Sequence, residues 1–156
     1  MYIWDMTERK VTLAMTKITK AHEMGCLHEA LLRQYLLNVE LLRYIVGHLS
    51  EDKDVADKKL LQVVKQFCVE VTTHPELRII IHPRNLKAVK PWAREMNGYF
   101  KGLKQGHLVA TTEKLIKDSQ VIFTLLHHSA SKLFLSARQR SVTKQTVTKQ
   151  SIKKSI

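Results

Sequence analysis

The chain has 156 residues, of which 44% are hydrophobic and 26% are charged, and a formal net charge of +12 at pH 7. This length and apolar content suffice for one hydrophobic core without disulfides or metals, which argues against a globally disordered chain. No apolar run approaches the roughly 18 residues of a membrane span, and only 5 glycines and 3 prolines disfavour a many-turned β structure.

Two helices are predicted in the first third of the chain. Residues 7–24 place Val11, Ala14 and Ile18 at helical spacing, and Gly25 interrupts the pattern. From residue 27 to about 49 follows the strongest apolar pattern, which predicts a central helix that contacts neighbours on most of its circumference. Its stripe, including the residues that widen it, consists of Leu27, Leu31, Leu32, Tyr35, Leu36, Asn38, Val39, Leu42, Ile45, Val46 and Leu49.

The middle of the chain predicts a third helix and a connector. Ser50 is a candidate N-cap, and the acidic residues after it suit the positive end of a helix dipole. The apolar stripe from Ala56 to Val71 predicts a helix that ends near His74-Pro75. The β-branched run 79–81 has no second strand to pair with, so we expect an extended connector there.

The last third predicts two more helices and a tail. One helix begins with Pro91 at its first position and ends at Gly106. The other begins after a cap at Thr111 or Thr112 and fades near residue 137. The Thr/Ser/Lys/Gln-rich segment 141–156 carries Val or Ile every five residues, a period that fits neither helix nor strand, so we expect it to be disordered in isolation.

Together these patterns predict an all-α fold, an antiparallel bundle of about five helices. We divide the chain into a helical bundle domain, residues 1–137, and a basic low-complexity tail, residues 138–156. Cys26 and Cys68 lack a CxxC spacing, which is typical of ordinary buried thiols in a reducing compartment. The segment MYIWDMTERK has no signal layout, and we expect a soluble, cytoplasmic protein.

Motifs for cofactors and metals are missing from the sequence. No phosphate loop, GxGxxG, HExxH or GxSxG pattern occurs. The nearest approach to a metal-ligand set is His22, Cys26 and His28, but Gly25 separates them and no fourth ligand is evident. We therefore predict neither a metal nor a cofactor.

The excess positive charge is confined to two segments. Residues 78–104 hold seven Lys and Arg against Glu95 alone, and residues 137–156 hold six Lys and Arg and no acid, whereas the rest of the chain is close to neutral. Such asymmetry favours an acidic partner. We expect nucleic-acid contacts from Arg78, Arg84, Lys87, Lys90, Arg94, Tyr99, Lys101, Lys104, Arg138, Arg140, Lys144, Lys149, Lys153 and Lys154.

The cations would contact phosphates, which gives affinity that falls with salt. Interleaved aromatic side chains could stack on bases. The spacing of Trp92 and Phe100 favours core packing for both. Tyr99 is the aromatic residue of this segment that we expect to be exposed.

Two stretches, AHEMGCLHEALLRQYLLNVELLRYIVGHL and TTEKLIKDSQVIFTLLHH, resemble the first helical hairpin and the closing helix of HEPN-domain proteins. The resemblance covers residues 20–48 and 111–128. It implies an all-α bundle that usually dimerises. The family includes RNases of toxin–antitoxin, phage-defence and CRISPR systems, and also non-catalytic members that bind RNA or protein partners.

The resemblance also implies where an RNase site would lie. The family signature is an Arg, a polar residue and, further on, a His, with four to six residues between Arg and His. Here only Arg43 and His48, in RYIVGH, have that spacing, with Tyr44 in the polar slot. The pair lies at the end of the second predicted helix rather than near the chain's end, and five residues of helix place the two side chains about 140° apart.

The first functional prediction is a non-enzymatic helical module that binds nucleic acid, RNA before DNA, through residues 78–104 and the tail. The second is a HEPN-type ribonuclease or an inactive relative in a defence or toxin–antitoxin system, with Arg43 and His48 meeting across a homodimer. The third is a protein-interaction bundle with an acidic partner. None of the three involves a membrane.

Overall fold

The computed structural model describes the backbone of residues 6–102 and 109–154, and the side chains of residues 6–102 and 111–135. In this part of the chain every regular element is helical and no strand occurs, which confirms the all-α prediction. The elements are α1 (Glu8–Glu23), α2 (Leu27–Ser50), the 3-10 helix η2 (Val55–Asp57), α3 (Leu60–Thr73), α4 (Pro75–Ile80), α5 (Pro83–Lys101) and α6 (Val109–Lys154).

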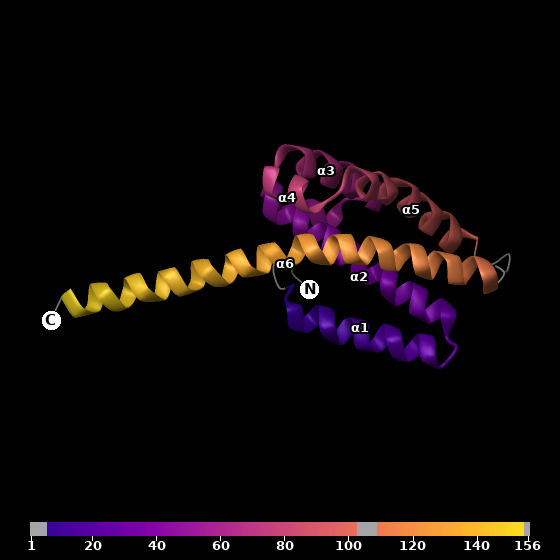
Figure 1. Cartoon of the computed structure of the whole chain (residues 1–156), viewed down its shortest axis with the longest axis horizontal. Coiled ribbons are helices and arrows are strands. Elements are labelled where there is room, and N and C mark those ends of the chain that lie inside the picture. The colour runs from indigo at the N-terminus through magenta and orange to yellow at the C-terminus, as the bar shows by residue number, and fades with distance from the viewer. Residues whose placement is uncertain (1–5, 103–108, 155–156) are drawn as a thin grey trace.

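The helices form a bundle around α2, which packs against α1, α3 and α6. α5 packs against α3 and α6, so α1 and α5 lie on opposite sides of the α2–α6 pair (Figure 1). α1 and α2 form an antiparallel hairpin, and α5 is antiparallel to α6. α2 and α6 run parallel, because Asn38 contacts Ser119 and, further along both helices, Tyr44 contacts Phe134.

The first hairpin forms as the sequence predicts. The Thr7 hydroxyl accepts a hydrogen bond from the Lys10 N–H at 3.3 Å, which caps α1. Gly25 has φ of 76°, the left-handed region in which glycine costs least, and it turns the chain into α2.

The face of α2 toward the core is almost completely apolar, with Leu31, Leu42 and Ile45 fully buried. Two members of the predicted stripe differ: Leu32 and Leu36 remain close to half exposed. Their exposure shows that no other helix of the described chain covers this side of α2. The prediction that they widen the buried face is therefore wrong.

The connection between α2 and α3 differs from the prediction at its start. Ser50 is the last residue of α2, and its hydroxyl donates to the Val46 carbonyl at 2.6 Å instead of capping a new helix. Asp52 organises the turn that follows. Its carboxylate accepts hydrogen bonds from the Lys58 ammonium, from the Asp54 N–H at 2.9 Å and from the Gln66 amide at 3.3 Å.

These donors, the Lys58 ammonium foremost, hold the pKa of Asp52 below its usual value. A carboxyl whose pKa is lower in the folded state stabilises the fold above its unfolded-state pKa and loses that contribution as the pH falls. We expect Asp52→Asn to lower the urea midpoint at neutral pH, and the difference from the native chain to shrink as the pH falls below about 4. Asp57→Asn, at an exposed carboxylate without an ion pair in the described chain, is the control. If Asp52→Asn lowered the urea midpoint equally at neutral and at acidic pH, the assignment of a lowered pKa to Asp52 would be contradicted.

Ile79 and Ile80 belong to α4, so the extended connector predicted for residues 79–81 is wrong for these two residues, and only Ile81 is extended. Pro75 stands at the first position of α4, where its missing N–H costs nothing. Leu77 and Ile81 are buried. Helical geometry turns Ile79 to solvent, and its side chain is the most exposed large apolar group described.

α5 begins eight residues earlier than predicted. Pro83, not Pro91, occupies its first position, and the His82 ring accepts from the Arg84 N–H at 3.2 Å. Pro91 lies inside the helix on its exposed side. α5 ends at Lys101, with Gly102 as its C-cap, so the predicted helix end at Gly106 is wrong.

α6 is longer at both ends than predicted. It begins at Val109, so Thr112 is a buried residue inside the helix and caps nothing. It also continues as one helix to Lys154 and projects beyond the bundle (Figure 1). The prediction that the helix fades near residue 137 is therefore wrong, and residues 141–154, which we expected to be disordered in isolation, are helical as its continuation. Residues 109–154 contain no Gly or Pro, so nothing stops the helix once its first half is packed.

Candidate nucleic-acid interface

One face of α5 is lined by cations. At about 100° per residue, Lys87, Lys90, Arg94 and Lys101 fall within an arc of about 60°, and Arg84 lies about 60° beyond it. All five side chains are exposed. The buried side chains of α5, which include Trp92, Met96 and Tyr99, lie on the opposite side of the helix. The packing of α5 on the core therefore turns these five cations, the basic face, to solvent.

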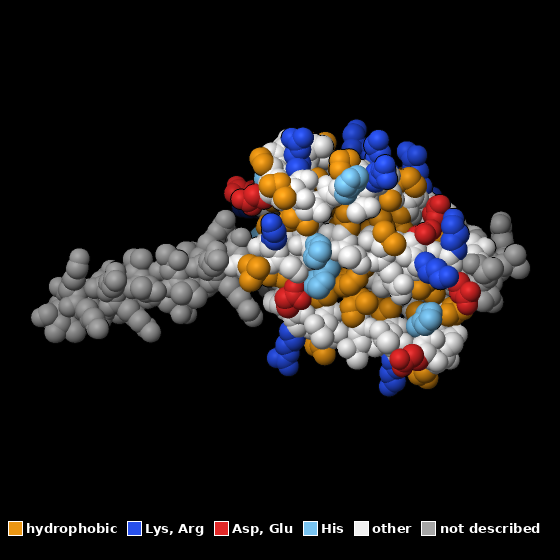
Figure 2. All heavy atoms as spheres, viewed as in Figure 1, with side chains coloured by type: hydrophobic (Ala, Val, Ile, Leu, Met, Phe, Trp, Pro, Cys, Tyr) orange, Lys and Arg blue, Asp and Glu red, His pale blue; other side chains and the backbone are white. Residues whose placement is uncertain are grey.

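No acid neutralises the basic face within the described residues. None of its five cations forms an ion pair or a side-chain hydrogen bond there. From Arg84 to Lys101 it extends for about 26 Å along the helix. Figure 2 shows Lys and Arg side chains gathered along the edge of the molecule formed by α3 and α5.

The start of the basic face, at Arg84, lies at the end of the bundle from which α6 projects (Figure 1). Arg78, on the adjoining helix α4, is exposed as well. α4 contacts both α3 and α6, and α5 starts beside it. Figure 1 shows that the projecting part of α6 leaves the bundle at this same end. The two basic segments of the sequence are thus neighbours in space.

The projecting part of α6 carries the other six predicted cations. Arg138, Arg140, Lys144, Lys149, Lys153 and Lys154 lie on its helical backbone, and their side chains are outside the described part. Helical register distributes these positions over about 240° of the circumference. Lys104 lies outside the described residues.

The aromatic residues of α5 do not provide a stacking surface. Tyr99 is only 3% exposed, so the prediction that it faces solvent is wrong. Its hydroxyl contacts the His28 ring and lies 3.2 Å from the Thr112 hydroxyl. The reason is register: Tyr99 lies seven residues after Trp92, on the same face of the helix. Cations alone define the described interface.

The predicted core positions of the other two aromatic residues are confirmed. Trp92 is buried, and its indole N–H donates to the Ser119 hydroxyl at 2.9 Å. Phe100 is half-buried, and its ring centre lies 4.9 Å from that of Tyr35. Both rings therefore serve to fix α5 on the bundle.

The cysteines differ from each other. Cys68, half-buried on α3, has its pKa raised by burial, which the nearby Lys90 ammonium partly offsets. This keeps the thiol protonated. Cys26, at the start of α2, is exposed, so the expectation that both thiols are buried is wrong.

Arg43 and His48 do not come together within this chain. The Arg43 guanidinium donates to the Lys58 carbonyl at 3.3 Å, while its Nε is buried without a partner in the described chain. The His48 ring contacts the Tyr44 carbonyl at 3.1 Å, and its centre lies 4.2 Å from that of the Tyr44 ring, with the two planes tilted by 40°. Arg43 thus ties α2 to the segment that leads into α3. The meeting of Arg43 and His48 across a dimer stays a prediction.

Among the described residues, no three His, Cys, Asp or Glu side chains are grouped as metal ligands would be. No helix in the described chain is long and apolar enough to cross a membrane. Comparisons with protein-family models, curated proteins and solved structures found no match. The functional argument therefore depends on the charge and geometry of this chain.

Proposed function

We propose that the protein is a non-enzymatic module that binds nucleic acid through the basic face of α5 and the projecting part of α6. The observation that carries the proposal is the basic face itself: five exposed cations on one side of a helix, without an acidic partner in the described chain. Cations held in this way attract a polyanion and release its counterions on binding.

The projecting part of α6 supports the same function. Its six cations have no acid among them to offset their mutual repulsion, so a polyanion would stabilise the helix. Because the positions of these cations on the helix span about 240° of its circumference, a phosphate backbone can approach from more than one side. RNA is the first candidate, since the HEPN-like pattern of residues 20–48 and 111–128 resembles a family with RNA-binding members.

The mode of binding follows from the side chains present. Tyr99 and Trp92 are buried and Phe100 is half-buried against Tyr35, so α5 has no fully exposed aromatic ring to stack on bases. Contacts from Lys and Arg to phosphates position a nucleic acid without reading its sequence. We therefore expect binding that depends strongly on salt and only slightly on base sequence.

The test is the binding of labelled single-stranded RNA, duplex RNA and duplex DNA to the whole chain between about 50 and about 200 mM salt. We expect log K to fall linearly with log salt, with a slope of about −3.5 or steeper for five or more phosphate contacts to a single strand. Two sequences of equal length should bind alike. Absence of binding at the lowest salt, or an affinity independent of salt, would contradict the proposal.

A further inference from the structure

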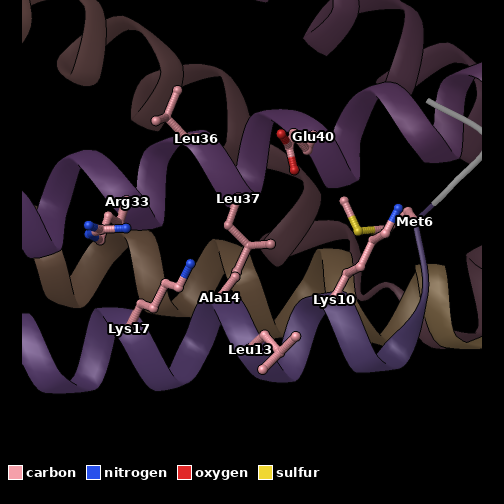
Figure 3. Close-up of a pocket in the computed structure, with 9 residues that line it drawn as sticks. All are labelled: Met6, Lys10, Leu13, Ala14, Lys17, Arg33, Leu36, Leu37 and Glu40. Carbon is pink, nitrogen blue, oxygen red and sulfur yellow. The ribbon is translucent and has the colours of Figure 1, made fainter. Parts of the chain in front are cut away.

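A groove of about 340 Å³ lies between α1 and α2, on apolar side chains that the bundle leaves uncovered (Figure 3). Its apolar lining consists of Leu13 and Ala14 from α1 and Leu36 and Leu37 from α2. Figure 3 shows Leu37 pointing toward α1, and Leu36 on the outer side of α2. Leu37 is buried, but Leu13 is 54% and Leu36 50% exposed.

The apolar surface continues along α2 beyond the groove. Leu32, one helical turn before Leu36, is 43% exposed. Single exposed leucines are ordinary on a protein surface, but neighbouring ones on two packed helices form a contiguous apolar strip. A strip of this kind, open along its length, matches one face of a third helix more closely than it matches a compact ligand.

The rim of the groove is mainly positive. It carries Lys10 and Lys17 from α1, and Arg33 and Glu40 from α2. Figure 3 shows both lysines reaching from α1 toward α2. Arg33 already pairs with Glu29 at 2.9 Å, whereas Lys10 and Lys17 form no ion pair in the described chain.

The positive charge of Lys10 and Lys17 decides which kind of segment the groove can bind. The projecting part of α6 carries six cations and no acid, so the rim lysines repel it. A second copy of the chain would bring two rims of the same sign together. An occupant with carboxylates beside its apolar residues is attracted by Lys10 and Lys17 instead.

We propose that the groove binds an acidic amphipathic helix of another protein. Its apolar side chains, spaced at i, i+4 and i+7, cover Leu13 and Leu36, and its flanking Asp and Glu pair with Lys10 and Lys17. The groove is on the opposite side of the α2–α6 pair from the basic face (Figure 1). This interaction is therefore separate from nucleic-acid binding, and either can fail without the other.

The probe is a synthetic helical peptide with leucines at i, i+4, i+7 and i+11 and glutamates at the flanking positions. A second peptide keeps the leucines and has lysine for every glutamate, and a third contains the residues of the first in scrambled order. Each is labelled and titrated with the whole chain by fluorescence anisotropy. We expect only the first to bind, and hydrogen exchange to be slowed in α1 and α2.

Substitutions in the groove test its location. Leu36→Ala should weaken binding of the acidic peptide about 5- to 10-fold, and Lys17→Glu about 3- to 10-fold. Leu61→Ala and Lys65→Glu make the same changes at exposed positions of α3 and should leave binding unchanged. All four variants keep their helices intact by circular dichroism if the native side chains are exposed as described.

Four outcomes would overturn the proposal. The first is that the acidic peptide does not bind, and the second is that the lysine or the scrambled peptide binds as tightly as the acidic one. The third is that Leu36→Ala and Lys17→Glu have no larger effect than the α3 controls. The fourth is a dimer in sedimentation equilibrium that Leu36→Ala dissociates, since this would assign the groove to a second copy of the chain.

Discussion

Replacing Trp92 by alanine is expected to lower the free energy of unfolding by about 3 to 5 kcal/mol. The indole is buried where α5 meets α2 and α6. It packs near Tyr35 of α2, with ring centres 6.2 Å apart, and its N–H donates to Ser119 of α6. The substitution removes a large apolar group and one buried hydrogen bond from a single position.

Ser119 explains why Trp92→Ala lowers the free energy of unfolding by more than the loss of one side chain's packing. Its backbone carbonyl accepts from the Asn38 amide of α2 at 3.0 Å, and its hydroxyl is also 3.7 Å from the Met96 sulfur. Trp92, Asn38 and Ser119 thus join three helices through one buried polar network. Such networks are costly when one member loses its partner.

Urea denaturation followed by circular dichroism measures this effect. Trp92→Phe keeps most of the apolar volume and should lose less, about 1 to 2 kcal/mol, mainly the hydrogen bond. Arg94→Ala, two residues along on the exposed side of α5, should change stability by less than about 0.5 kcal/mol. A loss below about 1 kcal/mol for Trp92→Ala would show that α5 does not pack as described.

Replacing Arg84, Lys87, Lys90 and Arg94 together by alanine is expected to weaken RNA binding at low salt by at least about tenfold. Each cation that contacts a phosphate of a single strand adds about 0.7 to the slope of log K against log salt. The slope should therefore become shallower by up to about 3. Stability should change little, because all four side chains are exposed and form no ion pair in the described chain.

A control variant tests whether RNA binding depends on the location of the cations or only on the net charge of the chain. Replacing Arg9, Lys10, Lys17 and Lys20 by alanine removes the same charge from α1, on the other side of the bundle (Figure 1). We expect this variant to bind RNA nearly as tightly as the native chain. Equal weakening by both variants would mean that overall charge, and not the basic face, attracts the nucleic acid.

Periodicity predicts the helices whose pattern is long and one-sided. α1 and α2 begin and end within one residue of the predicted bounds, because Gly25 and the apolar repeat act together. Leu32 and Leu36 show the limit of the method. A hydrophobic pattern identifies apolar positions, but it cannot show that no neighbouring helix covers them.

Proline and the low-complexity tail led to the largest errors. A proline can begin a helix or lie inside one, and the local sequence does not distinguish the two cases. Pro75 and Pro83 begin helices and Pro91 lies inside one. The packing of the buried Leu77 and Val89 decides between these cases. Residues 141–154 have no amphipathic pattern of their own. Their helix continues from the packed half of α6, a cooperative effect that local composition does not reveal.

The basic face was predicted from charge counts, but its geometry was not. Counting charged residues places the cations in residues 78–104. Five of them line up opposite the core only because α5 begins at Pro83 and continues to Lys101 as one helix. The same register buries Tyr99 against His28 and Thr112. The sequence signal for this was available: residues 92, 96 and 99 repeat at helical spacing with Trp92, which was assigned to the core.

The projecting part of α6 is tested most directly by an RNA salt titration of three chains. They are the native chain, a 1–136 truncation, and a full-length variant with Arg138, Arg140, Lys144, Lys149, Lys153 and Lys154 replaced by glutamine. The described core contacts of α6 end at Phe134, so the truncation should keep the bundle's helices by circular dichroism.

We predict that the truncated and the glutamine chains bind RNA at least about tenfold more weakly at low salt, with a slope shallower by up to about 4 for six lost phosphate contacts. Equal affinities and slopes for the truncated and the glutamine chains would show that the projecting part of α6 contributes to RNA binding through its charge and not through its length. The same affinity and slope for all three chains would contradict the claim that the basic face and the projecting helix together form a nucleic-acid interface.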